Sequence, residues 1–443
     1  MYDRSSNAIF IIDTDDYDPT RVSKKTYVSK TAGSEGTEYE ILNLNPQGPH
    51  LGDADVSEID ERDDPESGDT NVLHYRSVVC RNGRVLAMGV PKGLELADFR
   101  AKYPVESRER GEQSGRPDLY TVANDLYVSE VVEGTMINLF YDPEAQSWEI
   151  ATKGAVGGNY WFLRTQYPSV GQCGMQLTFR QMFLEACGCD LREGTDINEI
   201  PFLAEFHKDM VYSFVLQHPL NHIVSYINAP ALWLVAVYWK ANCGRKIEYI
   251  TPVVYQTWDV FWNTPVPIHF PKRYEFGDEY GNYEGLITWV SDDGLGFDFT
   301  GVMITNMETG ERCRVENPDY LKALELRGNH PNLQYHFLTL LKENRAEIFL
   351  VYFPWYAGIF GAFHRQFLDF VRGVYMSYID RYIRKIVVVG GVLKQYMPHI
   401  WRLHHNVYLP SVANGSKTVI EYVMVENYML SLEAKEIIHY LNM

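Results

Sequence analysis

The sequence predicts an α+β protein with a core of antiparallel sheets and helices, followed by an all-helical C-terminal domain. Between Tyr75 and about Ala323, short alternating segments rich in β-branched residues are separated by Gly, Pro and Asn, which is typical of antiparallel strands. From about Asn332 onward, large apolar residues recur every three or four positions, which indicates helices. We therefore expect an acidic, partly disordered N-terminal arm at 1–70, a core domain at 71–331 and a helical domain at 332–443.

The first 70 residues differ from the rest of the chain in charge. They carry 17 acidic and 6 basic side chains, a net charge of −11 within a chain of net charge −18. A short apolar strand at 8–12 is followed by turn-forming residues and by an acidic run at 52–70, whose only sizeable apolar residues are Val56 and Ile59. Such a run buries too little apolar surface to offset its chain entropy, so we expect a mobile arm.

The core contains seven segments with strand character and one with helical character. The expected strands are 76–80, 84–90, 136–141, 148–152, 212–217, 231–238 and 285–290, and the expected helix is 178–187. In the C-terminal part, Phe363, Phe367, Phe370 and Val374 follow helical spacing, and 419–441 continues as further helix.

Composition excludes several classes of protein and of site. No apolar run reaches the roughly 18 residues that a membrane-spanning helix needs, and the first residues do not form a signal peptide. We therefore expect a cytoplasmic protein that does not contact a membrane. The six cysteines are irregularly spaced, and Cys187-Gly188-Cys189 has the wrong spacing for a zinc site, so reduced structural thiols are expected.

Four segments carry the candidate chemistry, in a fixed order along the chain. They are Tyr75-Arg76-Ser77 with Pro91-Lys92-Gly93; Val131-Val132-Glu133-Gly134-Thr135 with Lys153-Gly154; Ser213-Phe214-Val215 with His222; and Glu284-Gly285-Leu286-Ile287 with Arg314-Val315-Glu316.

In order and spacing, these segments resemble the RNA ligases of phages and giant viruses, within the covalent nucleotidyltransferase superfamily. In that family an arginine and a Pro-x-Lys-Phe-like element precede the nucleophile motif Lys-x-Asp-Gly-Ser. Four further motifs follow in order: Lys-Gly-Ser, a glutamate-containing motif, Glu-Gly-Phe-Val and Lys-x-Lys. The resemblance covers about residues 70–330 and implies a nucleotidyltransferase core, unrelated to the ATP-grasp fold.

The family's chemistry explains why these residue types recur. A lysine attacks the α-phosphate of ATP and forms a phosphoramidate, so its amine must be deprotonated. Carboxylates bind the divalent metal and the ribose, while lysines and an arginine neutralise charge that develops on the phosphates.

This sequence departs from the family at five positions, and at one of them, Arg314, the positive charge is kept. Val131 occupies the position of the nucleophilic lysine, and Val215 that of the metal- or nucleotide-binding glutamate. His222 replaces an arginine, and the Lys-x-Lys pair becomes Arg314 and Glu316, which reverses the second charge. The catalytic positions are therefore lost, and we expect neither catalytic residues nor a metal site.

The remaining matches define an expected vestigial nucleotide-binding set. It consists of Arg76, Lys92, Glu133, Gly134, Lys153, Glu284 and Arg314. Two outcomes remain open. The pocket is open to ATP and Mg²⁺, with no cofactor required, or the apolar side chains of Val131 and Val215 help to fill it as a structural core.

The leading hypothesis is a catalytically inactive RNA ligase-like protein that binds nucleic acid or serves as a structural component of a large DNA virus. Its candidate partners are RNA and viral or virion proteins, and its expected location is the cytoplasmic viral factory or the virion. One alternative is an active ATP-dependent ligase that uses a relocated lysine, Lys92 or Lys153. Another is a module that binds RNA ends without chemistry.

Overall fold

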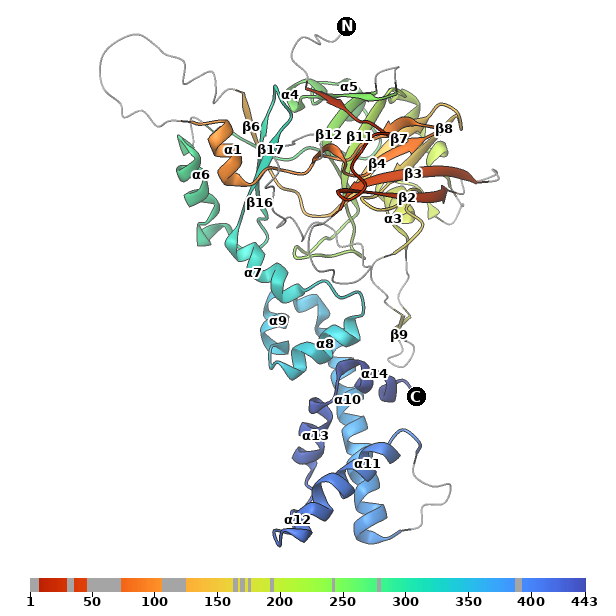
Figure 1. The fold of residues 1–443 in the computed structure, drawn as a ribbon, viewed down its shortest axis with the longest axis vertical. Helices are drawn as coiled ribbons and strands as arrows, with labels where there is room; N and C mark the ends of the chain where they lie inside the picture. The colour runs from red at the N-terminus through yellow and green to blue at the C-terminus, as the bar shows by residue number, and fades with distance from the viewer. Residues whose placement is uncertain are drawn as a thin grey trace, which may run out of the picture. The chain divides into compact units, whose positions relative to one another are not determined.

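The computed structural model describes residues 8–29, 36–45, 73–105, 125–161, 166–167, 172–173, 177–191, 195–240, 244–276, 280–386 and 393–443. The chain divides into two compact units (Figure 1). Unit 1 comprises Met1–Phe162 and Leu177–Arg327, and unit 2 comprises Leu163–Gln176 and Gly328–Met443. The acidic run at 52–70, for which we expect a mobile arm, lies outside the described residues.

The largest sheet of unit 1 has the strand order β1-β13-β12-β11-β7-β8, and its neighbouring strands are antiparallel. A short strand, β14, runs parallel beside β12. The bounds are β1 Ile9–Ile11, β7 Thr135–Asp142, β8 Ser147–Ala151, β11 Met210–Gln217, β12 Ala231–Lys240, β13 Lys246–Ile250 and β14 Ile268–His269. Because other elements cover both faces of this sheet, β11 is buried along nearly its whole length.

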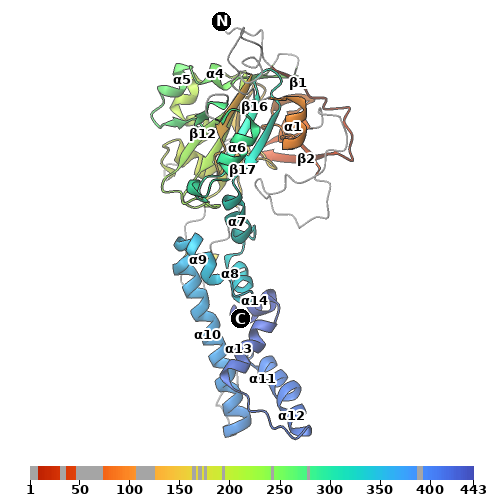
Figure 2. The ribbon, with the colours of Figure 1, turned by 90° about the vertical axis from the view of Figure 1, so that its left-hand side faces the viewer.

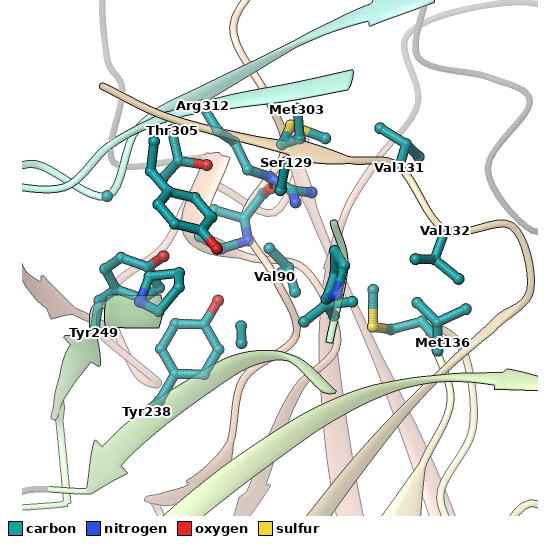
Figure 3. Close-up of a pocket in the computed structure, with 18 of the residues that line it drawn as sticks. Val90, Ser129, Val131, Val132, Met136, Tyr238, Tyr249, Met303, Thr305 and Arg312 are labelled. Carbon is teal, nitrogen blue, oxygen red and sulfur yellow. Dashed lines mark hydrogen bonds between the residues drawn. The ribbon is translucent and has the colours of Figure 1, made fainter. Parts of the chain in front are cut away.

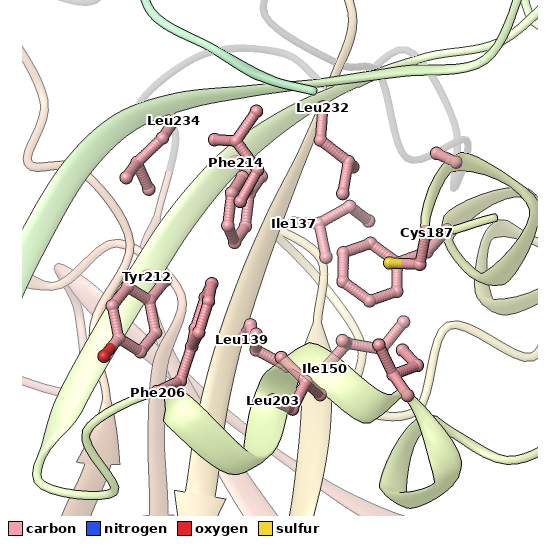
Figure 4. Packing of buried hydrophobic residues seen from close by; sticks show 14 of the residues in the cluster. Ile137, Leu139, Ile150, Cys187, Leu203, Phe206, Tyr212, Phe214, Leu232 and Leu234 are labelled. Carbon is pink, nitrogen blue, oxygen red and sulfur yellow. The ribbon is translucent and has the colours of Figure 1, made fainter. Parts of the chain in front are cut away.

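One face of this sheet packs against α3 (Phe179–Ala186) and the short 3-10 helices η4 (Ile197–Glu199) and η5 (Pro201–Glu205). Ile137, Leu139 and Phe214 belong to this cluster (Figure 4). The side chain of Thr178 caps α3 and accepts a hydrogen bond from the backbone N–H of Gln181, as in a capping box. The helix predicted at 178–187 is confirmed.

A second sheet, of order β2-β3-β4-β5, packs on the opposite face. Its strands are β2 Val22–Ser29, β3 Thr37–Leu44, β4 Val78–Arg81 and β5 Arg84–Ala87. Within the expected N-terminal arm, the strand predicted at 8–12 is confirmed as β1, whereas β2 and β3 form where no strand was predicted. Pairing explains the difference: Glu40 of β3 lies opposite Cys80 of β4, a contact between distant parts of the chain that local composition does not reveal.

A third sheet, of order β15-β6-β16-β17, is covered by α1 (Leu96–Lys102) and α6 (Tyr283–Val290). Its strands are β6 Leu126–Glu130, β15 Arg273–Tyr274, β16 Gly301–Asn306 and β17 Arg312–Glu316. Unit 1 also contains the helices α4 (Pro252–Tyr255), α5 (Asp259–Trp262) and α7 (Pro318–Arg327).

The strand predicted at 285–290 is wrong, because these residues belong to α6. The side chain of Asn282 caps this helix and accepts a hydrogen bond from Gly285 N at 2.8 Å. Tyr283, Leu286 and Val290 are buried with helical spacing, and this spacing outweighs the β-branched composition of the segment. The other six predicted strands are confirmed as parts of β4, β5, β7, β8, β11 and β12.

Unit 2 consists mostly of helices after Gly328, with a two-stranded sheet, β9 (Gln166–Tyr167) and β10 (Gln172–Cys173), in its earlier segment. The helices are α8 Leu333–Lys342, α9 Ala346–Tyr352, α10 Ala357–Tyr378, α11 Met397–Leu403, α12 Leu409–Ala413, α13 Tyr422–Ser431 and α14 Ala434–Leu441. Two π-helical segments, η9 (Ile379–Arg384) and η10 (His404–Tyr408), follow α10 and α11. The predicted helical spacing is confirmed, since Phe363, Phe367, Phe370 and Val374 are buried along α10. In the part of the chain that the structure describes, no helix has both the length and the apolarity to cross a membrane.

Candidate functional site

A pocket lies in unit 1 between the largest sheet and the third sheet (Figure 3). One wall comes from β7, β11, β12 and β13, and the other from β6, β16 and β17. The walls enclose about 910 Å³ of space, part of it open to solvent.

The apolar side of the pocket contains two of the positions predicted to have lost catalytic function. Val131 is half-buried just after β6, and its backbone N–H donates a hydrogen bond to the carbonyl of Gly301 at 3.0 Å. Val215 is only 4% exposed and lies in β11 opposite Met136 of β7. Val132 and Met136 extend the same surface (Figure 3). The two valines therefore line an open pocket, although both have apolar side chains.

An irregularity in β12 turns additional side chains toward the pocket. Ser213 of β11 pairs with Ala236, whereas the next residue, Phe214, pairs with Leu234, so Val235 is an extra residue. Val235 and Ala236 both line the pocket, and Tyr238 follows on the same side. A β-bulge of this kind re-aims side chains and is frequent next to functional sites.

Three arginines supply the positive charge of the pocket. Arg312 and Arg314 lie two positions apart in β17 and thus share a face of the sheet, while Arg76 approaches from the segment before β4. The Nε of Arg312 donates a hydrogen bond to the carbonyl of Pro91 at 2.8 Å, which fixes this side chain against the segment after β5. Figure 3 shows Arg312 extending toward the space between the walls.

Arg314, in contrast to Arg312, is held by a neighbouring carboxylate. Its side chain is 10% exposed, and its Nε lies 3.4 Å from Oε1 of Glu316. Among the described residues this buried Nε makes no hydrogen bond. Glu316 itself does not line the pocket. The arginine is therefore a buried cation whose neighbouring carboxylate satisfies it incompletely.

Few acidic groups oppose the positive charge of these arginines. Glu130 is the one acidic side chain among the described lining residues, and burial raises its pKa, an effect that nearby Lys272 opposes. The phenol of Tyr238 is fully buried, and burial raises its pKa although Arg312 and Arg76 act in the opposite direction. Three arginines against one glutamate give the lining an excess of positive charge.

Glu133 and Gly134 lie beside this pocket and have structural contacts. Both carboxylate oxygens of Glu133 accept a hydrogen bond from Val224 N at 3.0 Å, and Oε1 also accepts one from Ser225 N. Gly134 has a φ of +154°, and a Cβ there would lie 2.6 Å from the carbonyl oxygen of Leu216. The glycine thus permits a close approach between the start of β7 and β11.

Lys92, Lys153 and Glu284 do not line the pocket. Lys92 follows the lining residue Pro91, and its backbone N–H donates to the carbonyl of Leu73 at 3.1 Å. Lys153 is exposed in the turn after β8. Glu284 is exposed on α6 and forms an ion pair with Arg100 of α1 at 2.5 Å. The structure therefore brings together Arg76, Arg314, Val131 and Val215, but not these three residues.

His222 also lies outside the lining. Its Nδ1 accepts a hydrogen bond from Ile227 N at 3.0 Å, and its ring stacks on Tyr226. Burial lowers the pKa of His222 to about 4, so the imidazole is neutral at physiological pH.

Sequence reasoning missed Arg312. The Lys-x-Lys motif of the resembled family corresponds in sequence to Arg314 and Glu316, whereas the pocket contains Arg312 and Arg314. Alternation was the available signal, because in Arg312-Cys313-Arg314 the cysteine is fully buried and the arginines on either side face the other way. Among the described residues, no three His, Cys, Asp or Glu side chains are grouped closely enough to hold a metal ion.

No protein-family profile and no curated protein matches this sequence. Solved structures similar to it include an archaeal ATP-dependent RNA ligase, with 14% identity and a TM-score of 0.38 over 75% of this chain and 67% of that chain. A putative ATP-dependent DNA ligase from Aquifex aeolicus has 13% identity and a TM-score of 0.34, over 80% of this chain and 76% of that chain.

A mutant RNA ligase from Naegleria gruberi, solved with AMP and manganese, has 12% identity and a TM-score of 0.29. That match covers 44% of this chain and 51% of the Naegleria chain, about half of its length. In structure, the chain is similar to ATP-dependent RNA and DNA ligases at low sequence identity.

Proposed function

We propose that unit 1 binds a nucleotide non-covalently, as an RNA ligase-like protein without ligase chemistry. The observation that carries this proposal is the pocket itself, in which three arginines converge while position 131 is a valine. Guanidinium groups suit phosphate because they form charge-assisted, often paired, hydrogen bonds with its oxygens.

The rest of the lining suits the base and the sugar. Tyr127, Tyr238, Tyr249 and Tyr255 bring aromatic faces and hydroxyl groups to one region of the pocket. Val131, Val132 and Met136 form an apolar surface elsewhere in it. An apolar cleft with a few convergent polar groups is the usual form of a site for a small organic ligand, and a nucleotide combines such a ring system with a polyanion.

Two features argue against covalent catalysis. None of the described lining residues is a lysine, and Lys30 is the only lysine of the chain outside the described residues. Val215, at the position matched to a metal- or nucleotide-binding glutamate, adds no carboxylate. Without an amine nucleophile, the phosphoramidate of the resembled family does not form.

The wider role follows from the sequence resemblance. The protein serves a large DNA virus, as an RNA-binding or structural component in the viral factory or in the virion. Bound RNA presents its terminal phosphate to the same arginines that receive a nucleotide's phosphates.

Binding and labelling experiments on the full chain test this proposal. Titration calorimetry with ATP should give saturable binding, and incubation with α-labelled ATP and Mg²⁺ or Mn²⁺ should give no acid-labile protein adduct. Arg312→Gln and Arg314→Gln should each weaken binding by about 10- to 150-fold, because each removes a charge-assisted phosphate contact worth roughly 1.5–3 kcal/mol. Arg100→Gln, which removes a cation outside the pocket, is the matched control.

Absence of ATP binding at millimolar concentration, in a folded protein, contradicts the nucleotide-binding proposal. A covalent adduct instead supports the active alternative, and loss of labelling in Lys92→Ala or Lys153→Ala then identifies the nucleophile. RNA-end binding without ATP binding favours the end-recognition alternative. In that case the affinity should fall with rising salt, and it should weaken when Arg76 or Lys153 is neutralised.

A further inference from the structure

Unit 2 carries a basic surface that the pocket of unit 1 does not involve. We define the basic end as residues 376–386 and 393–419, which form the end of α10, η9, α11, η10 and α12. Both views of the ribbon show the end of α10 and α12 at the same end of the helical unit, away from α8 and α9 (Figures 1 and 2).

Side-chain contacts hold these elements together. The ring of Tyr382 in η9 stacks on His404 in η10, with centroids 3.8 Å apart and planes 7° from parallel. The guanidinium of Arg381 donates to the sulfur of Met397 in α11 at 3.9 Å. Thr418 N donates to the hydroxyl of Ser411 in α12 at 3.0 Å, which closes the segment after α12. The basic end is therefore a folded surface, and its two π-helical segments meet at the stacked rings.

The charge of this surface opposes that of the chain. It carries Arg381, Arg384, Lys385, Lys394, Arg402 and Lys417 against Asp380 alone, a net charge of +5 within a chain of net charge −18. Asp380 pairs with Arg384, and Arg402 pairs with Glu436 of α14. Within the part of unit 2 that the structure describes, the other four cations form no ion pair.

Large apolar side chains of the basic end are exposed as well. Trp401 is 52% exposed, Leu393 is 60% exposed and Val419 is 71% exposed. Further exposed apolar residues of the basic end are Met376, Ile383, Ile386, Leu409 and Val412. Isolated exposed apolar residues are ordinary, but a group of them among cations marks an interaction surface.

We propose that the basic end binds the surface of an anionic lipid bilayer. This proposal replaces the expectation of no membrane contact, which rested on the lack of a membrane-spanning run and did not address binding at a bilayer surface. A bilayer surface suits both features, because anionic head groups attract Lys and Arg while Trp and aliphatic side chains enter the boundary between head groups and acyl chains. The cations attract the anionic bilayer and the apolar side chains insert into it, so binding requires both.

Two other occupants fit less well. A second copy of the chain, docking through the same surface, brings two groups of net charge +5 together. A nucleic acid satisfies the cations and stacks on aromatic rings, but it leaves exposed aliphatic residues such as Leu393, Ile383 and Val419 without apolar contacts. The bilayer accounts for charge and apolarity together.

Co-sedimentation of the full chain with lipid vesicles tests the proposal. The protein should pellet with vesicles of mixed phosphatidylserine and phosphatidylcholine, should stay in solution with pure phosphatidylcholine, and should be released by high salt. Lys385→Glu with Lys394→Glu should lower the partition coefficient by at least about 25-fold, since each basic residue near such a surface contributes about fivefold. Trp401→Ser with Ile383→Ser should also abolish pelleting, although this variant keeps its charge.

Matched controls test whether pelleting depends on the residues of the basic end or on exposed apolar and basic residues anywhere in unit 2. Ile348→Ser with Val351→Ser removes two exposed apolar residues of α9, and Arg345→Glu with Lys435→Glu reverses two cations elsewhere in unit 2. Both control variants should pellet as the unchanged protein does. An unchanged unfolding midpoint shows that each variant is folded.

Three outcomes overturn the proposal. The first is no difference between anionic and neutral vesicles. The second is loss of pelleting in the control variants to the same degree. The third is binding of single-stranded RNA, or formation of a dimer, that depends on the basic end while vesicles are not bound.

Discussion

Both carboxylate oxygens of Glu133 lie 3.0 Å from the backbone nitrogen of Val224. Glu133, two residues after Val131, thereby links the segment that follows β11 to the start of β7. Ser225 N donates to the same carboxylate, and Gln217 donates to the backbone carbonyl of Glu133. In the family that the sequence resembles, the corresponding acid follows a nucleophile. In this chain its described contacts hold the wall of the pocket together.

Glu133→Ala should therefore destabilise unit 1 by about 1–3 kcal/mol, because the buried N–H of Val224 and the partly buried N–H of Ser225 lose their acceptor. Urea unfolding followed by tryptophan fluorescence measures this loss. Glu284→Ala, which breaks an exposed ion pair with Arg100, should change the free energy of unfolding by less than about 1 kcal/mol. Equal effects of the two substitutions would show that the buried contacts of Glu133 contribute no more than a surface charge.

Gly134→Ala should destabilise the protein more than an alanine at another glycine of positive φ. At 134 the new methyl group meets the carbonyl oxygen of Leu216 and a methyl group of Val215, each at 2.6 Å. Gly281 has a φ of +72°, and a methyl group added there would have no atom within 4 Å, so Gly281→Ala isolates the backbone strain, about 1–2 kcal/mol. The difference between the two unfolding free energies then reports the steric contact between β7 and β11 together with the difference in backbone strain between a φ of +154° and a φ of +72°.

His399 should make the stability of unit 2 depend on pH. Burial lowers its pKa to about 4 from an ordinary value of 6.5, Arg402 adds to this effect, and the phenol of Tyr428 lies 3.1 Å from its Nδ1. The unfolded chain thus binds more protons than the folded chain between pH 6.5 and 4. Stability is fully present above pH 6.5 and is lost as the pH falls through this window.

His399→Phe keeps a ring in place but removes this titration. Urea midpoints from circular dichroism at pH 7.5, 6.5, 5.5 and 4.5 should therefore fall less steeply in this variant than in the unchanged protein. His439→Gln changes an exposed histidine of α14 and should leave the slope as it is. A slope that His399→Phe does not alter would exclude His399 as its source.

Lys240 should produce a pH dependence at the alkaline side. Burial lowers its pKa to about 8 from 10.5, while Asp209 and Asp142 act in the opposite direction. Its Nζ donates to the carbonyl of Tyr141 at 2.8 Å. Between pH 8 and 10.5 the unfolded chain binds the additional proton, so stability should rise with pH in this window. Lys240→Met should remove that rise in denaturation experiments at pH 8, 9 and 10, and Lys246→Met, an exposed residue of β13, serves as its control.

The fold was largely predictable where the pattern is local. Alternation predicted β7, β11 and β12, and the spacing of Phe363, Phe367 and Phe370 predicted α10. The strands β2 and β3 were not predicted, because much of β2 is exposed and polar and β3 is secured by pairing with β4, far along the chain. The prediction of a strand in place of α6 was wrong because Ile287 and Val290 favour strands locally, while the cap at Asn282 and the buried face decide for a helix.

Pocket residues were predictable from the sequence only where they belong to one of the matched motifs. Val131, Val215, Arg76 and Arg314, which come from different matched motifs, all line the pocket. Glu284 lies on α6, where a strand was predicted, and does not line the pocket. Arg312 was missed because the register of β17, in which Thr305 lies opposite Arg312, is set by pairing with β16 and is not visible in a short motif.

The valine at position 131 also affects how the occupancy of the pocket depends on ligand concentration. An enzyme that forms a lysyl adduct keeps the nucleotide until a second substrate removes it, so its adduct level reflects earlier turnover. A hydrocarbon side chain forms no such bond. If a nucleotide binds as proposed above, its occupancy of the pocket follows the free ligand concentration and the dissociation constant at each moment. Under the proposed function, unit 1 would therefore respond reversibly to the current nucleotide concentration, independently of earlier binding events.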